Sequence, residues 1–215
     1  MLLWQYEHPT NTFVFSSHPG KISALQFDPY GDVFASANYH GPVSLWKFHL
    51  GNGRTHPSTV IQCHAKTTYD LKFLSSSTLF STCGHSGDDR NVRIWDMLLP
   101  GHKSCVINFA ASESDPRRIL FDESGMRIFA ACHRGEIEIY DIRMQRLYKS
   151  IVAHYNQHVT SIALHEGSLI TAGSDGIIKA WDTSSGLDIK NSFTFSIDKV
   201  KPHRIDKQQV RLILI

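Results

Sequence analysis

Short stretches in which apolar and polar residues alternate recur along the chain, and Gly, Pro, Asp or Ser bounds most of them. Residues 136–140 (E-I-E-I-Y) show the alternation most clearly. A period of two is typical of a β-strand with one buried face, and the bounding residues favour tight turns between antiparallel strands. Residues 136–166 contain no Gly or Pro and could hold a helix, but the alternation predicts strands there as well.

Several of these predicted strands end in an aromatic residue, and the aromatic residues are regularly spaced. They stand at positions 4, 46, 95, 140 and 181, with spacings of 42, 49, 45 and 41 residues. A period of roughly 40–45 residues indicates a repeat protein in which each unit is a small sheet that packs on its neighbours.

Each unit has the same internal order: a loop with a histidine, a strand, a turn, a second strand, a glycine-bearing turn and the strand that ends in the aromatic residue. This order resembles the WD-repeat β-propeller family, in which four antiparallel strands form a blade. The resemblance implies an all-β WD-repeat β-propeller with four complete blades and partial blades at both ends. The predicted repeats lie at about 13–47, 59–96, 104–141 and 150–182, with a partial repeat at 1–12, all within propeller residues 1–190, and with the start of a further blade or a frayed tail at 191–215.

An incomplete propeller would have unpaired strand edges, which favour aggregation. We therefore expect the chain to be part of a larger protein, and we expect it to self-associate when it is expressed alone. Additional aromatic-ending repeats on either side would support this expectation.

The composition narrows the possible functions. The chain has 22 Lys and Arg against 20 Asp and Glu, which is a formal net charge of +2 and gives no strong field for nucleic acid or an anionic membrane. The first residues do not resemble a signal peptide, and no stretch approaches the roughly 20 apolar residues that span a bilayer. Four scattered cysteines without a CxxC pair favour a cytosolic, reduced protein. We expect no nucleic-acid binding and no direct membrane insertion.

The last repeat contains a histidine, a hydroxyl and a carboxylate that together could suggest a hydrolase: His154, Thr171 and Asp175. Asp175 and Thr171 stand six and ten residues before Trp181. The resemblance to WD repeats implies that these four residues form an internal hydrogen-bonded set, a blade tetrad, because buried polar groups need partners. We therefore expect no catalytic residues and no enzymatic activity.

The other repeats contain incomplete versions of the tetrad, and such degraded copies favour a structural role over a catalytic one. The first repeat has His40 where the aspartate is expected, and the third has Ala130, Arg134 and Tyr140 at the matching positions. The second has a longer turn, in which Asp89 is the candidate carboxylate. The partial tetrads are His18, Ser36 and Trp46 in the first repeat and His64, Thr82, Asp89 and Trp95 in the second.

The thirteen histidines and four cysteines raise the possibility of a metal site. A zinc site needs about four converging ligands with tight pair spacings. The candidate pairs, among them Cys63–His64 and Cys132–His133, fall on different predicted blades. No glycine-rich phosphate loop follows a strand and opens a helix. We expect no metal and no cofactor.

Four segments resemble one WD-repeat subfamily in particular. In their order along the chain, these segments are similar to the C-terminal propeller of the DmX-like (rabconnectin) family; they are residues 22–28, 62–68, 84–96 and 141–147. The elongated G-H-S turn before R-N-V is the most specific of them. The resemblance implies a scaffold that promotes assembly of the vacuolar-type proton pump (V-ATPase) and so vesicle acidification. It implies V-ATPase subunits or assembly-complex partners as ligands, and a cytoplasmic location peripheral to endosomal or synaptic vesicle membranes.

Loops on a rigid frame commonly supply the contacts of a binding protein. A second interpretation is a substrate receptor of a cullin-type ubiquitin ligase. Residues 140–143 (Y-D-I-R) resemble the short motif, or box, through which some propellers bind a cullin adaptor, although the first residue is altered. Arg143 is the candidate contact with the adaptor. The candidate protein-binding loop residues on the face of the loop histidines are Tyr39, His40, His85, Asp88, Arg90, His133, Arg134, Tyr155 and His158.

Overall fold

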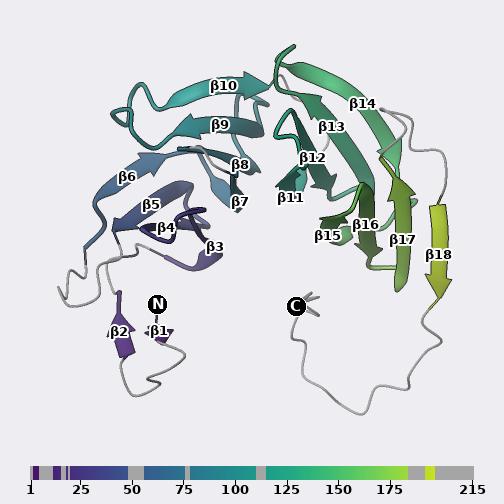
Figure 1. Cartoon of the computed structure of the whole chain (residues 1–215), viewed down its shortest axis with the longest axis horizontal. Coiled ribbons are helices and arrows are strands. Elements are labelled where there is room, and N and C mark those ends of the chain that lie inside the picture. The colour runs from purple at the N-terminus through teal and green to yellow at the C-terminus, as the bar shows by residue number, and fades with distance from the viewer. Residues whose placement is uncertain are drawn as a thin grey trace. The chain divides into compact units, whose positions relative to one another are not determined.

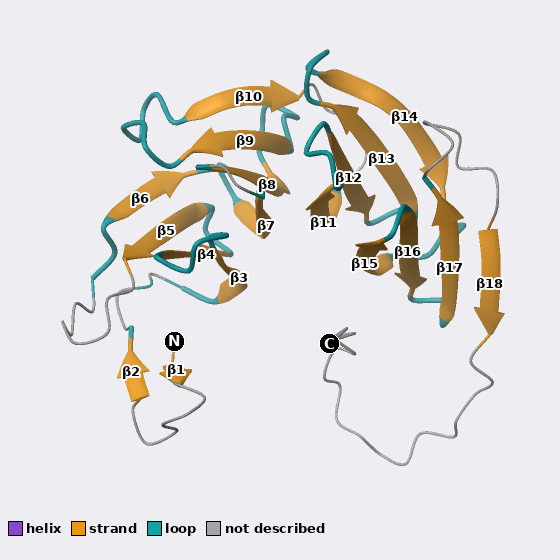
Figure 2. Ribbon diagram, viewed as in Figure 1, coloured by secondary structure: helices purple, strands orange, loops and turns teal. Residues whose placement is uncertain are grey.

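The computed structural model describes residues 2–4, 12–15, 18, 20–47, 56–75, 78–109, 115–183 and 192–196. Of the strands at 2–4, 12–14 and 192–196, only the backbone is described. Every regular element in these ranges is a β-strand (Figure 2), so the prediction of an all-β protein is confirmed. The chain divides into two compact units, residues 1–113 and 114–215.

The first unit contains two four-stranded antiparallel sheets and one strand pair (Figure 1). The strands follow chain order within each sheet, as in an up-and-down meander. The pair is β1 (Leu2–Trp4) with β2 (Thr12–Val14); the sheets are β3 (Ile22–Phe27), β4 (Val33–Asn38), β5 (Pro42–Lys47) and β6 (Thr59–Gln62), and β7 (Thr67–Phe73), β8 (Leu79–His85), β9 (Val92–Asp96) and β10 (Cys105–Phe109).

The second unit contains two further sheets of the same kind. Each again consists of four consecutive strands with antiparallel pairing. The sheets are β11 (Pro116–Phe121), β12 (Arg127–Cys132), β13 (Glu136–Asp141) and β14 (Arg146–Val152), and β15 (Val159–His165), β16 (Ser168–Gly173), β17 (Ile177–Asp182) and β18 (Ser192–Ser196).

The sheets are offset from the sequence repeats by one strand. The first strand of each predicted repeat pairs with the aromatic-ending strand of the repeat before it: β6 pairs with β5, β10 with β9 and β14 with β13. In the same way, β18 is the fourth strand of the last sheet and pairs with β17. Successive repeats are therefore joined by backbone hydrogen bonds as well as by side-chain packing.

The two middle strands of the sheets contain most of the buried side chains. In the first unit, Phe34 stacks on Trp46 with ring centroids 5.8 Å apart, and Phe80 stacks on Trp95 at 6.5 Å. Such aromatic pairs bury large apolar areas, so the aromatic end of each repeat stabilises its own sheet.

Neighbouring sheets within a unit also pack on one another. In the first unit, Val43 and Ile61 of one sheet share an apolar core with Leu71 of the next sheet. The Thr68 hydroxyl donates a 2.6 Å hydrogen bond to the Gly41 carbonyl between the same two sheets. In the second unit, Ile137 packs in one core with Val159 of the following sheet.

Candidate functional site

The polar residues of the last repeat are joined in one hydrogen-bonded chain. The Trp181 indole donates to Thr171 Oγ1 at 3.1 Å, the Thr171 hydroxyl lies 3.0 Å from His154 Nε2, and His154 Nδ1 lies 2.9 Å from Asp175 Oδ2. With the proton of a neutral His154 on Nδ1, every group in the chain has a donor or an acceptor. Asp175 also accepts the Ile177 amide at 2.9 Å. The structure therefore brings together all four residues of the predicted tetrad.

The second repeat has the same series of hydrogen bonds, but one of the four residues is different. The Trp95 indole donates to Thr82 Oγ1 at 2.8 Å, and His64 Nε2 lies 2.9 Å from the same hydroxyl. The partner of His64 Nδ1 is Ser86 Oγ, at 2.9 Å. The expectation for Asp89 is therefore wrong: Asp89 is exposed in the turn with a φ of 57°, because the longer turn places Ser86 where the last repeat has Asp175.

The first repeat lacks the last residue of this hydrogen-bonded series, the partner of the histidine Nδ1. The Trp46 indole donates to Ser36 Oγ at 2.7 Å, and His18 Nε2 is hydrogen-bonded to the same hydroxyl. His40 takes the place of the aspartate and is exposed, and the buried His18 Nδ1 has no hydrogen-bond partner among the described residues. An unpaired buried donor costs about 1–3 kcal/mol.

The third repeat replaces the hydroxyl and indole with another pair. Ala130 lies opposite Glu138 in the β12–β13 pairing, and the buried Tyr140 hydroxyl donates to Glu138 Oε2 at 2.6 Å. Glu138 was not expected from the sequence, although its place two residues before the aromatic residue is also polar in the other repeats.

The position two residues before the aromatic residue contains a cation in two repeats. Arg93 donates from Nη1 to the Cys63 carbonyl at 3.0 Å, and Lys179 donates from Nζ to the Ala153 carbonyl at 2.6 Å. In both cases the carbonyl belongs to the residue just before the loop histidine. These hydrogen bonds join the aromatic-ending strand to the connection from the preceding sheet. In the sequence, the indication of these bonds is that each cation stands two residues before the tryptophan of its repeat.

The backbone around the tetrads has no room for side chains at particular positions. A methyl group at Gly173 would lie 2.3 Å from His154 Nδ1 and 2.4 Å from Asp175 Oδ1. Glycine therefore lets the imidazole and the carboxylate meet directly over the β16 backbone.

The buried environment of the tetrads sets their protonation. Burial first, and then the positive charge of Arg93, lowers the pKa of His64 from 6.5 to about 3. Burial works to raise the pKa of Asp175, but hydrogen bonds from His154 and the Ile177 amide outweigh it and lower this pKa. His154 and Thr171 have no exposed surface, and their polar atoms bond to one another. This arrangement staples strands together and offers no accessible nucleophile.

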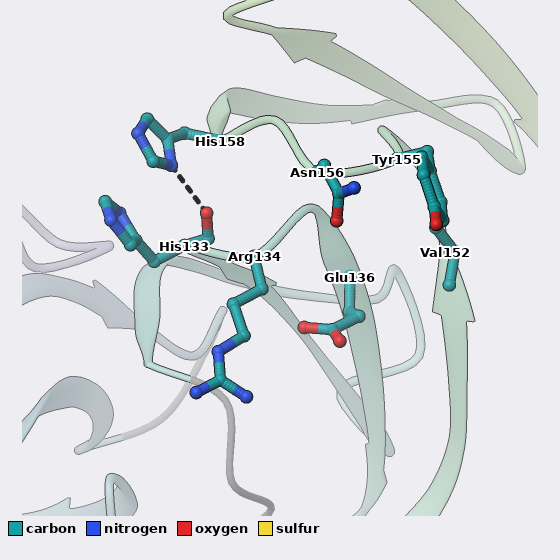
Figure 3. A pocket seen from close by; sticks show the side chains of 7 residues that line it. All are labelled: His133, Arg134, Glu136, Val152, Tyr155, Asn156 and His158. Atoms are coloured by element: carbon teal, nitrogen blue, oxygen red, sulfur yellow. Dashed lines mark hydrogen bonds between the residues drawn. The ribbon is translucent and has the colours of Figure 1, made fainter.

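Four of the predicted loop residues come together in the second unit. His133 and Arg134 in the β12–β13 turn and Tyr155 and His158 in the β14–β15 loop line a shallow depression of about 410 Å³ (Figure 3). The other lining residues, which sequence reasoning missed, are Glu136, Val152 and Asn156.

A glycine holds the two loops of this depression together. Gly135 has a φ of 93°, and its carbonyl accepts the amides of Ala153 and His154, each at 2.9 Å. A methyl group at Gly135 would lie 1.7 Å from the His154 carbonyl oxygen. The turn can therefore approach the neighbouring loop only because this position has no side chain.

The two histidines of the depression form a stacked pair. Their ring centroids are 3.7 Å apart with an angle of 16° between the planes. His158 Nδ1 lies 2.6 Å from the His133 carbonyl oxygen and therefore donates to it. The His158 amide donates to Ser174 Oγ at 3.0 Å, which fixes the loop to the β16–β17 turn.

The remaining candidate loop residues lie elsewhere. Tyr39 is exposed beneath the Lys21 ammonium, which is 5.1 Å from the ring centroid. Asp88 forms a two-point ion pair with Arg93 Nη2, at 2.8 and 2.9 Å, and accepts the Arg90 amide at 3.2 Å. The others are exposed or half-buried in loops or at strand ends: His40, His85, Arg90 and Arg143.

Among the residues that the structure describes, no group of three or more His, Cys, Asp or Glu side chains is placed to hold a metal ion. Within the same residues, no helix is long and apolar enough to cross a membrane.

One solved structure with a similar fold is a β-propeller domain. The β-propeller domain of Cps50 (Swd1) from Myceliophteria thermophila matches with a TM-score of 0.70 and 17% identity, covering 91% of this chain and 64% of that chain. The computationally designed Ika4 protein matches with a TM-score of 0.63 and 18% identity, covering 79% and 96%. At these identities the likeness shows the fold.

Sequence relatives include two larger proteins. DmX-like protein 1 from Mus musculus is 28% identical over 192 residues, which are 86% of this chain and 6% of that protein. The U5 small nuclear ribonucleoprotein 40 kDa protein from Dictyostelium discoideum is 23% identical, over 85% of this chain and 48% of that protein. The chain thus spans less than half of each, and its likeness to DmX-like protein 1 is shared with other WD-repeat proteins.

A family model describes most of the chain. The model named Nucleolar protein 10-like, N-terminal domain matches residues 24–207, which include all four four-stranded sheets except the first two residues of β3. The chain therefore belongs to this family of WD-repeat β-propellers.

Proposed function

We propose that this chain is a non-enzymatic protein-interaction scaffold, and that it acts in the machinery that promotes assembly of the vacuolar-type proton pump. One observation carries the scaffold assignment. The histidines, hydroxyls and carboxylates that resemble a catalytic set are consumed by internal hydrogen bonds, whereas His133, Arg134, Tyr155 and His158 gather at an open depression.

The depression has the features of a docking surface. Its loops are held on strands by backbone hydrogen bonds through Gly135, so the side chains are presented on a rigid frame. Tyr155 is 80% exposed, and tyrosine and arginine are enriched among residues that contribute most to binding energy.

The pump assignment extends the resemblance to the DmX-like family, and the 28% identity to DmX-like protein 1 over most of this chain supports it. In this proposal the partners are V-ATPase subunits or assembly-complex proteins, and the chain is located in the cytoplasm at the surface of endosomal or synaptic vesicles. The chemistry of proton transport belongs to the pump, and the chain contributes contacts.

The test is affinity purification of the tagged chain, followed by immunoblotting for V-ATPase subunits. We compare the wild type with Tyr155→Ala and Arg134→Glu, which change the depression, and with Lys103→Glu, an exposed residue of the first unit, as the control. The proposal expects the pump subunits to be retained by the wild type and the control and lost by the two loop variants. Absence of pump subunits from the wild-type eluate would reject the pump assignment.

A second candidate is the ligase receptor, favoured by the exposure of Arg143 in the turn after β13. Its first box residue, Tyr140, is buried and bonded to Glu138, which leaves Arg143 as the accessible part. Arg143 lies at the other end of β13 from Arg134, so Arg143→Glu tests this role separately. Capture of a cullin adaptor by the wild type and its loss in Arg143→Glu would favour the receptor.

A further inference from the structure

The depression of the second unit contains one fixed cation, one carboxylate and two imidazoles. Arg134 carries a positive charge, Glu136 is a carboxylate, and His133 and His158 belong to the residue type that changes charge between pH 5 and 8. With both imidazoles neutral, the formal charges of Arg134 and Glu136 cancel. Uptake of one proton by the histidine pair makes the depression positive.

The stacked geometry limits the pair to one added proton. Two imidazolium ions with centroids 3.7 Å apart would repel strongly, which disfavours the doubly charged pair. Burial, then His158 and Arg117, lower the pKa of His133, while Asp115 opposes them. His133 therefore takes up a proton at a lower pH than an ordinary histidine side chain does.

The other charged groups around the pair already have partners. Arg117 and Asp115, at the start of β11, bind each other at 2.7 Å. Asp175, in the β16–β17 turn, is bonded to His154. By contrast, Arg134 makes no ion pair or hydrogen bond through its side chain with any described residue. Arg134 and the histidine pair are thus the groups left to meet a ligand from the open side.

We propose that the depression binds an acidic segment of a partner protein, with a carboxylate side chain against Arg134 and the His133–His158 pair, and that this binding strengthens as the pH falls below neutral. The inference rests on the proposed function, in which this depression is a docking surface. Protonation of the pair adds a positive charge to that of Arg134, so binding of the carboxylate strengthens. The exposed side chains of Val152 and Tyr155, which lie on the side of Glu136 and Asn156 in Figure 3, receive an apolar side chain of the same segment.

The test uses the 215-residue chain and fluorescence anisotropy. The probe is a fluorescein-labelled peptide, Gly-Glu-Glu-Leu-Glu-Glu-Gly, and its matched control has Gln in place of each Glu. Glutamate stays ionised at pH 5.5, so a change in affinity between pH 7.5 and 5.5 reports on the protein. The Glu peptide is expected to bind about two- to fivefold more tightly at pH 5.5, as for one added exposed ion pair, and the Gln peptide is not.

Variants assign the effect to these residues. Arg134→Gln weakens binding of the Glu peptide at both pH values, and the double substitution His133→Asn with His158→Asn removes the pH dependence. His165→Asn, at an exposed histidine of β15, is the matched control and keeps the wild-type pH response. If the double variant does not fold, NMR titration of the His133 ring in the wild type replaces it, and addition of the Glu peptide is expected to raise the pKa of His133.

Three results would overturn the inference: equal affinity for the Glu peptide at both pH values, a pH response that survives the double substitution, or binding of a phosphoserine peptide in the absence of binding to the Glu peptide. The two proposals fail separately. Loss of pump-subunit capture with pH-dependent binding of the Glu peptide rejects only the pump assignment, and pump capture without peptide binding rejects only the acidic-segment inference.

Discussion

Acidification from pH 7.5 to pH 5 is expected to destabilise the folded protein because His64 is buried in its neutral form. His64 is 1% exposed, its Nε2 accepts the Thr82 hydroxyl and its Nδ1 donates to Ser86. In the unfolded chain this imidazole takes up a proton below about pH 6.5. In the folded chain its pKa is about 3.

The two pKa values of His64 determine the sign and the size of the change in the free energy of unfolding. Between pH 6.5 and pH 3 the unfolded state binds more protons than the folded state, so the free energy of unfolding falls as the pH falls. At about 1.4 kcal/mol per pH unit below the unfolded pKa, His64 alone removes about 2 kcal/mol at pH 5. The stability is fully present above about pH 6.5.

Urea denaturation at a series of pH values measures this effect, with His64→Gln as the comparison. The variant is less stable at pH 7.5, but its stability should fall by about 2 kcal/mol less than that of the wild type between pH 7.5 and 5. NMR titration of the His64 ring checks the cause directly. A folded-state pKa near 6 for His64, or parallel pH profiles for the two proteins, would refute the reasoning.

Three other substitutions test the tetrads and the links between sheets. Thr171→Val leaves the Trp181 indole and His154 Nε2 without their shared partner and should lower the free energy of unfolding by about 1–3 kcal/mol, whereas Thr160→Val at an exposed position of β15 should change it by less than about 1 kcal/mol; a similar loss in both would contradict the role of the network. His40→Asp should raise the free energy of unfolding by about 1 kcal/mol, because it supplies an acceptor for His18 Nδ1 at the position that Asp175 has in the last repeat, and an unchanged or lower denaturation midpoint would show that the carboxylate does not reach His18. Lys179→Met removes the hydrogen bond to the Ala153 carbonyl and should lower the midpoint by an amount that corresponds to about 1–3 kcal/mol; a change no larger than in Lys103→Met, at an exposed lysine, would count against the link.

The tetrad of the last repeat shows how far the sequence pattern reaches. The spacing of His154, Thr171, Asp175 and Trp181 follows the period of the repeat, and a periodic backbone places equivalent positions in equivalent surroundings. The spacing matched these residues to the set that WD repeats share, and this resemblance predicted which groups meet. The second repeat departs from this rule, because its longer turn shifts the register and makes Ser86 the partner of His64.

The sequence by itself determined the all-β class, the repeat period and the aromatic residue near the end of the third strand of each four-stranded sheet, because these depend on local alternation and on fixed spacing along the chain. Only the tertiary structure decided that each sheet takes its fourth strand from the next repeat, since strand pairing is settled by backbone hydrogen bonds between distant segments. The depression in the second unit also depends on the tertiary structure, because it is formed by segments that are distant in the sequence. His133 and His158 are 25 residues apart in the chain, and they stack because Gly135 lets one loop approach the backbone of the other.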